Sequence, residues 1–222
     1  MAHASRHSSG KPKIEAIIFD IGRVIVGLDP ARALPAFKGA GSGTGASGAG
    51  EKLSSEKIWA AIQVDPLWRG FQEGRVSPQE WYENLTRRFG VRVNYEEFVA
   101  AWNSVILPET LLPNRLFERL SRRCKLVLLS NTDPIHVAHM EATFSFMHYF
   151  PARIYSCEVR ASKPSPVIFR AAIRAAGTPA GRIMFVDDVR GYVQAARRLG
   201  LDGVQFRTRG LLEGELRIRG IL

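Results

Sequence analysis

Short apolar runs alternate with amphipathic segments through the second half of the chain, from Leu111 onwards. A short apolar run bounded by polar residues is typical of a buried strand, and apolar residues three and four positions apart are typical of a helix. We expect strands over residues 125–129, 154–159, 183–186 and 203–206, and helices over residues 116–122, 135–146, 164–176 and 193–199. Strands that alternate with helices form a parallel sheet with helices on both faces. The sequence therefore predicts an α/β fold.

A further apolar run near the amino terminus, residues 14–19, predicts another buried strand of this sheet, and Asp20 stands at its end. Polar residues also stand at the ends of later strands or at the start of a helix: Ser130, Asn131, Lys163, Asp187 and Asp188. In open parallel sheets, functional sites lie at the carboxyl ends of the strands. We therefore expect these side chains to gather at one edge of the sheet.

The stretch between these two parts carries helical patterns and no convincing strand. Ser77 and Glu80 form a capping-box pattern, with Pro78 at the first helical position. We expect a disordered leader over residues 1–13, an α/β domain made of residues 14–28 and 109–222, and a small helical insertion over residues 29–108. Within the insertion, residues 39–50 are almost all Gly, Ala and Ser, which predicts a flexible loop.

The chain has 31 Lys and Arg residues against 21 Asp and Glu residues, which gives a net charge of +10. A basic balance favours anionic partners, but nucleic-acid binding needs a stripe or patch of basic residues. The Arg residues here are dispersed, mostly over expected helix faces. We expect a small anionic metabolite as the partner and no nucleic acid, and a protein that is a monomer or a homodimer.

Neither the hydropathy nor the cysteines indicate a membrane or an oxidising compartment. No apolar stretch is long enough to span a bilayer, and the polar segment 1–10 lacks the apolar part of a signal peptide. The two cysteines, Cys124 and Cys157, are too few for a disulfide framework and lack metal-ligand spacing. We therefore expect inert thiols, no membrane contact and a cytoplasmic protein.

The polar residues at the expected sheet edge suit attack on a phosphoryl group. A carboxylate such as Asp20 can form a covalent intermediate with an electrophilic centre. The attack needs cationic help, which Lys163 and a hard divalent ion held by Asp20 and Asp188 can supply. The Ser130 hydroxyl and the NH groups after it can bind phosphate oxygens. Each residue also has a structural interpretation: a strand-end cap for Asp20, a turn for Ser130, a surface charge for Lys163 and a helix cap for Asp187 and Asp188.

The same residues carry a resemblance to a known family. Segments 19–24, 130–132, 163–169 and 185–188 resemble the four motifs of the haloacid dehalogenase (HAD) superfamily: they read Phe-Asp-Ile-Gly-Arg-Val, Ser-Asn-Thr, Lys-Pro-Ser-Pro-Val-Ile-Phe and Phe-Val-Asp-Asp. The resemblance extends over residues 14–206. The helical insertion is similar to the helical cap of HAD phosphatases, phosphomutases and dehalogenases. The resemblance implies a Rossmann-like core with this cap beside it.

The resemblance also implies a role for each residue. Asp20 would be the nucleophile that becomes an aspartyl phosphate, and Lys163 would stabilise the charge of the nucleophile and the phosphate. Ser130 would bind the phosphoryl group, helped by the backbone of Asn131. A Mg²⁺ ion would be held by the three ligands that the family uses, here Asp20, Asp188 and the main-chain carbonyl of Gly22. Asp187 would support the ion through water or orient Lys163.

Two positions depart from the family pattern. Most HAD phosphatases carry a second Asp two residues after the nucleophile, where this chain has Gly22. That Asp acts as general acid and base, a contribution of roughly 10²–10⁴ in rate, so its absence makes the efficiency of this chain an open question. The family often has Asp or Asn four residues beyond the second carboxylate, where this chain has Tyr192. We expect this change to weaken the support of the ion.

The combined prediction is a Mg²⁺-dependent phosphatase of a small phosphorylated metabolite, for example a sugar phosphate. A 2-haloacid dehalogenase and a catalytically weakened domain that binds phosphate or a partner are the alternatives. Among the large aromatic residues of the cap, Trp68 and Phe71 are the best candidates for a substrate wall, because they lie near a Gly-bounded turn. Arg23 and Arg190 lie beside motif residues, where each can either meet an anionic substrate or be a bystander.

Overall fold

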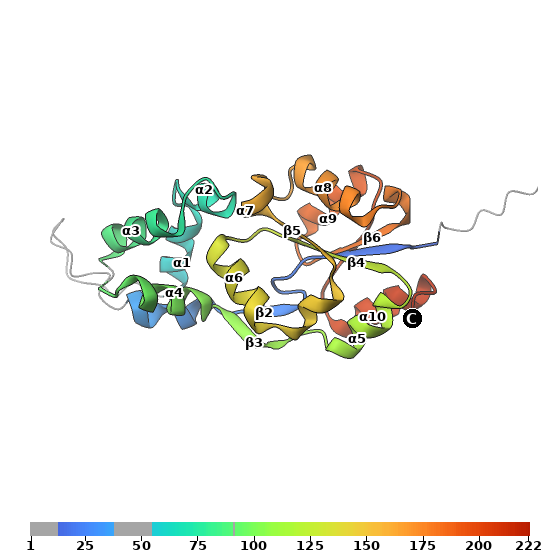
Figure 1. The fold of residues 1–222 in the computed structure, drawn as a ribbon, viewed down its shortest axis with the longest axis horizontal. Helices are drawn as coiled ribbons and strands as arrows, with labels where there is room; N and C mark the ends of the chain where they lie inside the picture. Colours follow the sequence, from blue (N-terminus) through green and yellow to red (C-terminus); the bar gives the residue numbers. More distant parts are fainter. Residues whose placement is uncertain (1–12, 38–54, 91) are drawn as a thin grey trace, which may run out of the picture.

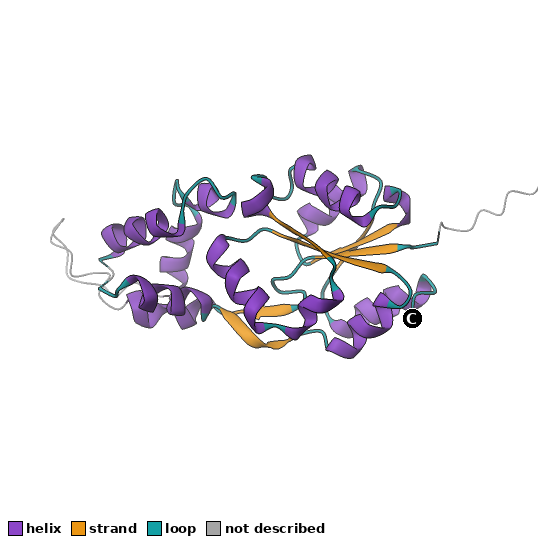
Figure 2. Cartoon of the chain, in the orientation of Figure 1, coloured by secondary structure: helices purple, strands orange, loops and turns teal. Residues whose placement is uncertain are grey.

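The computed structural model describes residues 13–37, 55–90 and 92–222. The expected leader lies outside the described residues except for Lys13, and the expected Gly-rich loop 39–50 lies outside them completely. Figures 1 and 2 show a sheet flanked by helices and, at one end of the molecule, a separate group of helices. The α/β fold class predicted from the sequence is confirmed.

The central sheet has five parallel strands in the order β5-β4-β1-β6-β7. Its strands are β1 (Ala16–Phe19), β4 (Lys125–Ser130), β5 (Ala152–Tyr155), β6 (Ile183–Asp187) and β7 (Asp202–Gln205). β1 lies between β4 and β6, with Phe19 opposite Leu128 on one side and Val186 on the other. The first strand of the chain is therefore the middle strand of the sheet, and its end lies between the ends of β4 and β6.

Helices cover both faces of the sheet because successive side chains of each buried strand point to opposite faces. On one face lie α5 (Asn114–Ser121), α6 (Pro134–Thr143) and α10 (Arg209–Ile218), and on the other lie α8 (Pro166–Ala176) and α9 (Arg190–Arg198). In β1, Ile17 and Phe19 belong to the first hydrophobic cluster, whereas Ala16 and Ile18 belong to the second. This alternation explains why the strands read as continuous apolar runs.

The insertion has a hydrophobic cluster beside the sheet, to which Ile135 from α6 of the core also belongs. Its elements are η1 (Pro30–Phe37), α1 (Ser55–Gln63), α2 (Trp68–Gln72), α3 (Pro78–Phe89) and α4 (Tyr95–Asn103). Phe71, Trp81, Leu85, Phe98 and Trp102 are buried at its centre. The capping box expected at Ser77 is present, because the Ser77 side chain accepts from the Glu80 NH group and the Glu80 side chain accepts from the Ser77 NH group.

A short antiparallel ribbon connects the insertion to the core. β2 (Val26–Leu28) and β3 (Ile106–Thr110) pair with Leu28 opposite Ile106. The expectation that no strand lies between residues 29 and 108 is therefore wrong for the last residues of this range, where β3 begins. Pro108 interrupts the apolar run and hides the strand, but a ribbon of two edge strands tolerates Pro. The ribbon holds the outgoing and returning chain side by side.

Four further differences concern the carboxyl half of the chain. Residues 156–159 form a helix, α7 (Ser156–Val159), instead of continuing the strand, because β4 ends at Ser130 opposite Tyr155 and leaves no partner beyond it. The expected helix over residues 135–146 ends at Thr143 and is followed by η2 (Ser145–Tyr149), and a further 3₁₀ turn, η3 (Ala180–Arg182), precedes β6. The last helix, α10, was not predicted.

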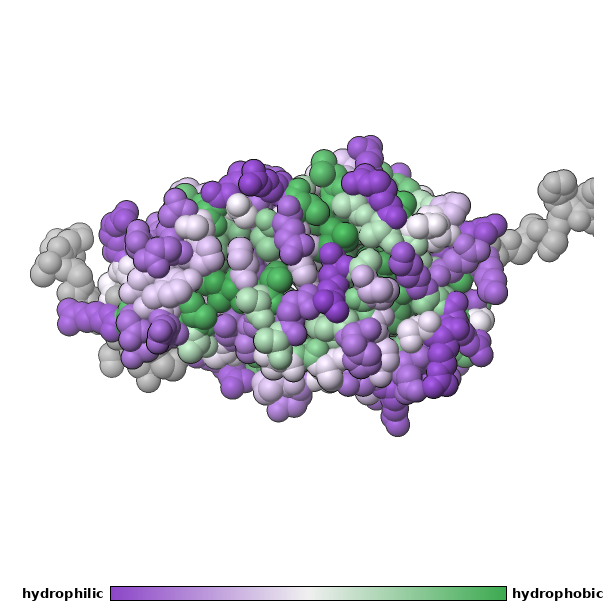
Figure 3. All heavy atoms as spheres, in the orientation of Figure 1, coloured by the Kyte–Doolittle hydropathy of each residue, from purple (hydrophilic) through white to green (hydrophobic). Residues whose placement is uncertain are grey.

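The visible surface is mixed. Figure 3 shows strongly hydrophilic residues over both ends of the molecule, with hydrophobic residues appearing between them. Several Arg side chains on helix faces pair with a carboxylate one turn away, such as Arg209 with Glu213 and Arg122 with Glu118. Across the described part of the chain, no helix has both the length and the apolar character needed to cross a membrane.

Candidate active site

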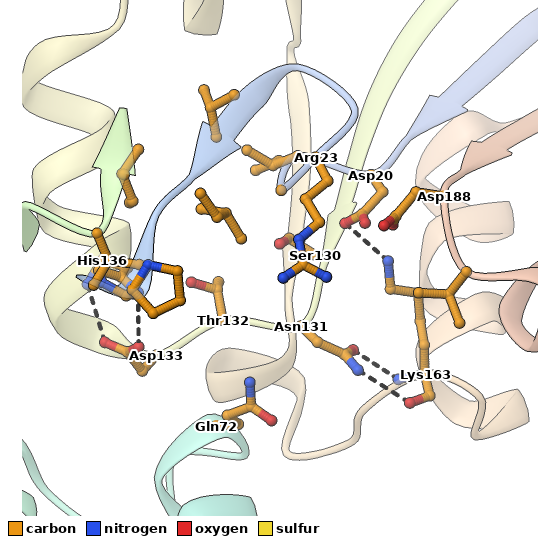
Figure 4. A pocket seen from close by; sticks show the side chains of 18 of the residues that line it. Asp20, Arg23, Gln72, Ser130, Asn131, Thr132, Asp133, His136, Lys163 and Asp188 are labelled. Atoms are coloured by element: carbon orange, nitrogen blue, oxygen red, sulfur yellow. Dashed lines mark hydrogen bonds and ion pairs between the residues drawn. The ribbon is translucent and has the colours of Figure 1, made fainter. Parts of the chain in front are cut away.

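The predicted site residues meet at the carboxyl edge of the sheet, where three neighbouring strands end. Asp20 follows β1, Ser130 is the last residue of β4 and Asp187 is the last residue of β6. All three are buried. Because these strands are parallel neighbours with aligned ends, residues more than 160 positions apart in the chain come into one site. Figure 4 shows the side chains of Asp20, Asp188 and Lys163 turned toward one another.

Lys163 makes the central contacts of the site. Its Nζ lies 2.9 Å from Asp20 Oδ1 and donates to Asp187 Oδ2 at 2.6 Å and to the Leu129 carbonyl at 3.2 Å. The residue is only 3% exposed. Burial disfavours an ammonium charge, but Asp20 and Asp187 more than offset this effect and raise the pKa of Lys163 above 10.5. Lys163 is therefore a fixed positive charge against the candidate nucleophile.

Three carboxylates surround this ammonium. Asp20, Asp187 and Asp188 each offer an oxygen, and these oxygens lie within 4.8 Å of one another. Burial, and then the charge of Asp20, raises the pKa of Asp188. Burial likewise raises the pKa of Asp187 to about 7, with Lys163 acting against this rise and Asp20 adding to it. Oxygen ligands with surplus negative charge fit a hard divalent cation such as Mg²⁺.

The two neighbouring aspartates have different contacts. Asp187 accepts hydrogen bonds from Lys163 through Oδ2 and from the Val189 NH group, at 2.8 Å, through Oδ1. Asp188 is half-buried, and its main-chain carbonyl accepts from the Gln205 side chain at 2.9 Å. The Asp187 carboxylate is thus engaged in holding Lys163. This contact corresponds to the second of the two roles considered for Asp187 from the sequence.

The amide side chain of Asn131 is also engaged with the lysine loop. Its Oδ1 accepts from the Lys163 NH group at 2.7 Å, and its Nδ2 donates to the Lys163 carbonyl at 3.0 Å. A phosphate contact from Asn131 would therefore come from its backbone, as the sequence resemblance implied. Ser130 is 5% exposed and lines the same pocket as Asp20.

Tyr192 stands where the family pattern has Asp or Asn. Lys163 Nζ lies 5.2 Å from the centre of the Tyr192 ring, within the range of a cation–π contact. The Tyr192 hydroxyl is 3.5 Å from Asn131 Nδ2, which is the long limit of a hydrogen bond. Tyr192 therefore contacts the ammonium and offers no carboxylate or amide to an ion.

A pocket opens above these residues. The helical insertion (η1 and α1–α4), which we call the cap, forms its opposite wall. The cap side chains that line it include Trp59, Gln63, Trp68 and Gln72, from α1 and α2. Trp68 lines the pocket, as expected for a substrate wall. Phe71 does not, because it is fully buried and stacks on Trp81 with ring centres 5.0 Å apart. One helical turn carries Trp68 to the pocket and Phe71 into the cap core.

One side of the pocket contains a buried ion pair that joins cap and core. Asp133 caps α6, and its Oδ2 lies 3.0 Å from His136 Nδ1 and accepts from Trp102 Nε1 at 3.2 Å. His136 Nε2 lies 3.0 Å from the Trp102 carbonyl, and the two rings stack. A carbonyl and an ionised carboxylate can only accept hydrogen bonds, so both ring nitrogens of His136 carry a proton.

The pKa values agree with this charge assignment. Burial acts against the charge of His136, but Asp133 and the Trp102 carbonyl raise the pKa of His136 above 6.5. Burial also acts against the charge of Asp133, but His136 lowers the pKa of Asp133 below 3.8. The pair is therefore an imidazolium and a carboxylate that both bind the same cap residue, Trp102.

The other side of the pocket holds a second connection between cap and core. The Ser156 hydroxyl accepts from the Thr132 NH group at 2.9 Å and donates to the Gln72 carbonyl at 2.6 Å. The next cap residue, Glu73, accepts from the Ser162 NH group at 3.2 Å. The cap therefore binds Ser156, which in turn holds Thr132 in the segment after Ser130, and it also binds the residue directly before Lys163.

Sequence reasoning missed several pocket residues. Gln72 and His136 were not named, and Trp59 was not among the candidates for the substrate wall. For His136 a signal exists, because Asp133 and His136 are three positions apart at the start of the helix that follows Ser130. For Gln72 and Trp59 the sequence offers no signal, since only the docking of the cap turns their helices toward the sheet edge.

Comparison with known proteins gives a family match over most of the chain. A family model of haloacid dehalogenase-like hydrolases matches residues 14–200. D-ribitol-5-phosphate phosphatase of Bacteroides thetaiotaomicron is 24% identical over 198 residues, which are 86% of this chain and 91% of that protein.

Solved structures share the fold. A HAD family enzyme of Bacteroides thetaiotaomicron in complex with magnesium and inorganic phosphate is 25% identical, with a TM-score of 0.71 over 88% of this chain and 96% of that one. L-2-haloacid dehalogenase of Xanthobacter autotrophicus, with chloropropionic acid covalently bound, is 19% identical, with a TM-score of 0.60 over 94% and 84% of the two chains. The second likeness concerns the fold alone.

Proposed function

Because this chain belongs to the haloacid dehalogenase-like hydrolase family, we propose that it is a Mg²⁺-dependent phosphatase of small phosphorylated metabolites. One observation carries the proposal. The Lys163 ammonium lies 2.9 Å from Asp20 and 2.6 Å from Asp187, and Asp188 completes a group of three carboxylates. This group offers a nucleophile, a fixed cation and oxygen ligands within one small volume.

The reaction has two steps. In the first, a carboxylate oxygen of Asp20 attacks phosphorus, the bond between phosphorus and the ester oxygen breaks, and the alcohol leaves with that electron pair and gains a proton. In the second, a water oxygen attacks phosphorus and loses a proton, and the bond between phosphorus and the Asp20 oxygen breaks, which releases inorganic phosphate and restores the carboxylate. Lys163 holds Asp20 in place in both steps, because its ammonium is itself fixed by Asp187 and the Leu129 carbonyl.

A magnesium ion fits the donor set of this site. Asp20, Asp188 and the main-chain carbonyl of Gly22 would hold it, and it would supply positive charge against the phosphoryl oxygens. The relative solved with magnesium and inorganic phosphate supports this choice of ion. Asp187 serves Lys163 in this scheme, since its oxygens bind the ammonium and the Val189 NH group.

The carboxylates favour phosphoryl transfer over dehalogenation. Three acidic side chains around Lys163 suit a metal ion and a phosphate ester, whereas displacement of a halide by Asp20 needs no second or third carboxylate. The aromatic side chains of Trp59 and Trp68, and the amides of Gln63 and Gln72, line the pocket above Asp20. Apolar faces with hydrogen-bonding amides suit the carbon chain and hydroxyl groups of a sugar or polyol phosphate, and the similarity to a ribitol phosphate phosphatase agrees with this substrate class.

Residue 22 does not supply the proton to the leaving group, because glycine has no side chain to carry it. A Cβ atom at Gly22 would lie 3.0 Å from Leu28 Cδ1, the end of a flexible side chain. Leu28 therefore has to shift before an Asp fits at this position.

The experiment is hydrolysis of p-nitrophenyl phosphate and of a panel of sugar and polyol phosphates with Mg²⁺, before and after chelation of the metal. We expect the native chain to release phosphate only with Mg²⁺, and Asp20→Asn to be inactive. Glu109→Gln is the matched control, because Glu109 is an exposed carboxylate of β3 outside the pocket. Equal activity of Asp20→Asn and the native chain would refute the assigned nucleophile, and activity that survives chelation would refute the metal.

A further inference from the structure

The turn that follows the nucleophile holds an arginine in a left-handed backbone conformation. Arg23 has a φ of 59°, which is uncommon for a residue with a Cβ atom. Its NH group donates to the Val26 carbonyl at 2.7 Å, and the next two residues, Val24 and Ile25, are fully buried in the first hydrophobic cluster. The turn is therefore anchored by its neighbours, and Arg23 is the charged residue that it presents at the pocket.

The side chain of Arg23 faces the reacting groups. It lines the same pocket as Asp20, and Figure 4 shows its guanidinium extending into the pocket toward Ser130. Arg190 was an equal candidate from the sequence, since it also follows a motif. Arg190 does not line this pocket. The structure thus separates two arginines that the sequence could not distinguish.

Arg23 differs from the other cations of the pocket in that no carboxylate of the described residues lies within ion-pair distance of it, although its charge acts on Asp188. Lys163 is paired with Asp20 and Asp187, and His136 is paired with Asp133. Within residues 13–37, 55–90 and 92–222, no ion pair engages Arg23. Its five guanidinium donors remain available to a ligand in the pocket.

The charges of the site create a need for this cation. When all three carboxylates are ionised, they stand against one ammonium, and a divalent ion brings the group only to neutrality. A phosphate monoester carries a charge of about −1.5 to −2 near neutral pH. A neutral group of this kind offers such a ligand no net attraction. Arg23 adds one positive charge to this neutral group and so gives it a net attraction for the phosphate.

We propose that Arg23 binds the phosphoryl group that Asp20 receives, with its guanidinium donating two hydrogen bonds to phosphoryl oxygens. The inference rests on the proposed phosphatase function and adds a catalytic residue to it. A planar guanidinium matches two phosphate oxygens at once, whereas a lysine ammonium acts as a point charge. The contact would also hold the phosphoryl group against Ser130, toward which the guanidinium points.

The test measures binding of inorganic phosphate by calorimetry with Mg²⁺ present, so that it does not depend on turnover. Arg23→Asn is the informative variant, because Asn tolerates a left-handed backbone and removes the charge. We expect Arg23→Asn to bind phosphate about 10- to 100-fold more weakly than the native chain, the range for loss of hydrogen bonds to a charged group. Arg23→Lys should recover part of the loss. Arg190→Asn is the matched control and should leave the affinity unchanged.

Two results would overturn the assignment. One is an Arg23→Asn variant that unfolds like the native chain and binds inorganic phosphate with unchanged affinity. This holds even if the variant binds substrates with a second anionic group more weakly, because Arg23 would then contact that second group and not the phosphoryl group. The other is an equal loss in Arg190→Asn, which would indicate a general charge effect. If the native chain binds phosphate through Arg23 but hydrolyses no ester, the phosphatase proposal fails while the binding assignment stands.

Discussion

The side-chain amide of Asn131 binds both polar backbone atoms of Lys163, accepting from its NH group at 2.7 Å and donating to its carbonyl at 3.0 Å. The segment after β4 therefore fixes the position of the loop that carries the ammonium. The Lys163 side chain then returns to β4 and binds the Leu129 carbonyl at 3.2 Å. Backbone and side chain of the same lysine are thus held by one strand end.

Asn131→Ala removes both of these backbone contacts. We expect it to lower the free energy of unfolding by about 1–3 kcal/mol, two hydrogen bonds at the usual net value, and to lower kcat more than it raises KM because Lys163 loses its position. The measurement is urea unfolding together with steady-state kinetics. Asn114→Ala is the control, since the Asn114 amide donates to Ser145 at 2.8 Å on the surface. Equal loss of stability and activity in both variants would contradict the positioning role.

Tyr192 is expected to act through its ring. Tyr192→Phe keeps an aromatic face beside the Lys163 ammonium, whereas Tyr192→Leu removes it. A cation–π contact is worth about 0.5–2 kcal/mol, so we expect Tyr192→Leu to lose several-fold in kcat and Tyr192→Phe to stay close to the native value. The check is the ratio of kcat between the two variants. If Phe and Leu behave alike, the ring has no such role.

The pair of His136 and Asp133 should make stability depend on pH. The pKa of His136 is raised above 6.5 in the folded state. The contribution of His136 to the free energy of unfolding is therefore complete below pH 6.5 and is lost as the pH rises through the folded pKa. The pKa of Asp133 is lowered below 3.8, so its contribution is present above pH 3.8 and is lost as the pH falls through the folded pKa. Other titratable groups near the pair are His139 and Cys157.

His136→Gln tests this dependence. We expect it to cost about 3–5 kcal/mol in the free energy of unfolding at slightly acidic pH, the usual effect of removing one partner of a buried ion pair. The difference from the native chain should shrink as the pH rises above 6.5. Urea unfolding at a series of pH values measures it. His139→Gln, on the same helix, is the comparison, and a difference that stays constant with pH would contradict the charged state of His136.

Gly74 should be essential for docking of the cap. Gly74 has a φ of 63°, and a Cβ atom there would lie 2.0 Å from the Cys157 carbonyl oxygen of the core. We expect Gly74→Ala to cost about 1–3 kcal/mol for the overlap, beyond the backbone penalty, and to raise KM because Gln72, two residues before Gly74, lines the pocket.

Gly177→Ala is the matched control for this prediction. Gly177 has a φ of 72°, but the nearest atom to an added Cβ is Lys125 Nζ at 4.0 Å. Both variants therefore carry the same backbone penalty, and only Gly74→Ala carries the overlap. Thermal unfolding and KM are the measurements. Equal melting temperatures and equal KM values for the two variants would show that the contact with Cys157 is unimportant.

The strands in the carboxyl half of the chain were predictable because the apolar pattern that indicates each strand is local. Lys125–Ser130 and Ile183–Asp187 read as short apolar runs, and such runs need no information from elsewhere in the chain. Local reading failed where a partner strand decides the structure. Residues 156–159 carry apolar residues but have no strand to pair with beyond Ser130, and β3 contains a Pro that only an edge strand tolerates.

The site also has a part that was predictable from local patterns and a part that was not. The order of the strand-end residues indicated that Asp20, Ser130, Lys163, Asp187 and Asp188 belong together, since the ends of parallel strands share one edge of a sheet. The sequence could not show that Tyr192 would contact the ammonium of Lys163. It also could not show that Arg23, and not Arg190, would line the pocket.

The amino-acid sequence by itself determined the α/β fold, the sheet edge that carries the site and the residues that end each strand there, because periodicity and strand ends are local properties of the chain. The tertiary structure alone decided the pocket walls: Trp68 toward the site and Phe71 away from it, and Trp102 bound to Asp133 and His136. These contacts join residues from cap and core that lie far apart in the sequence, so they exist only once the two parts have docked.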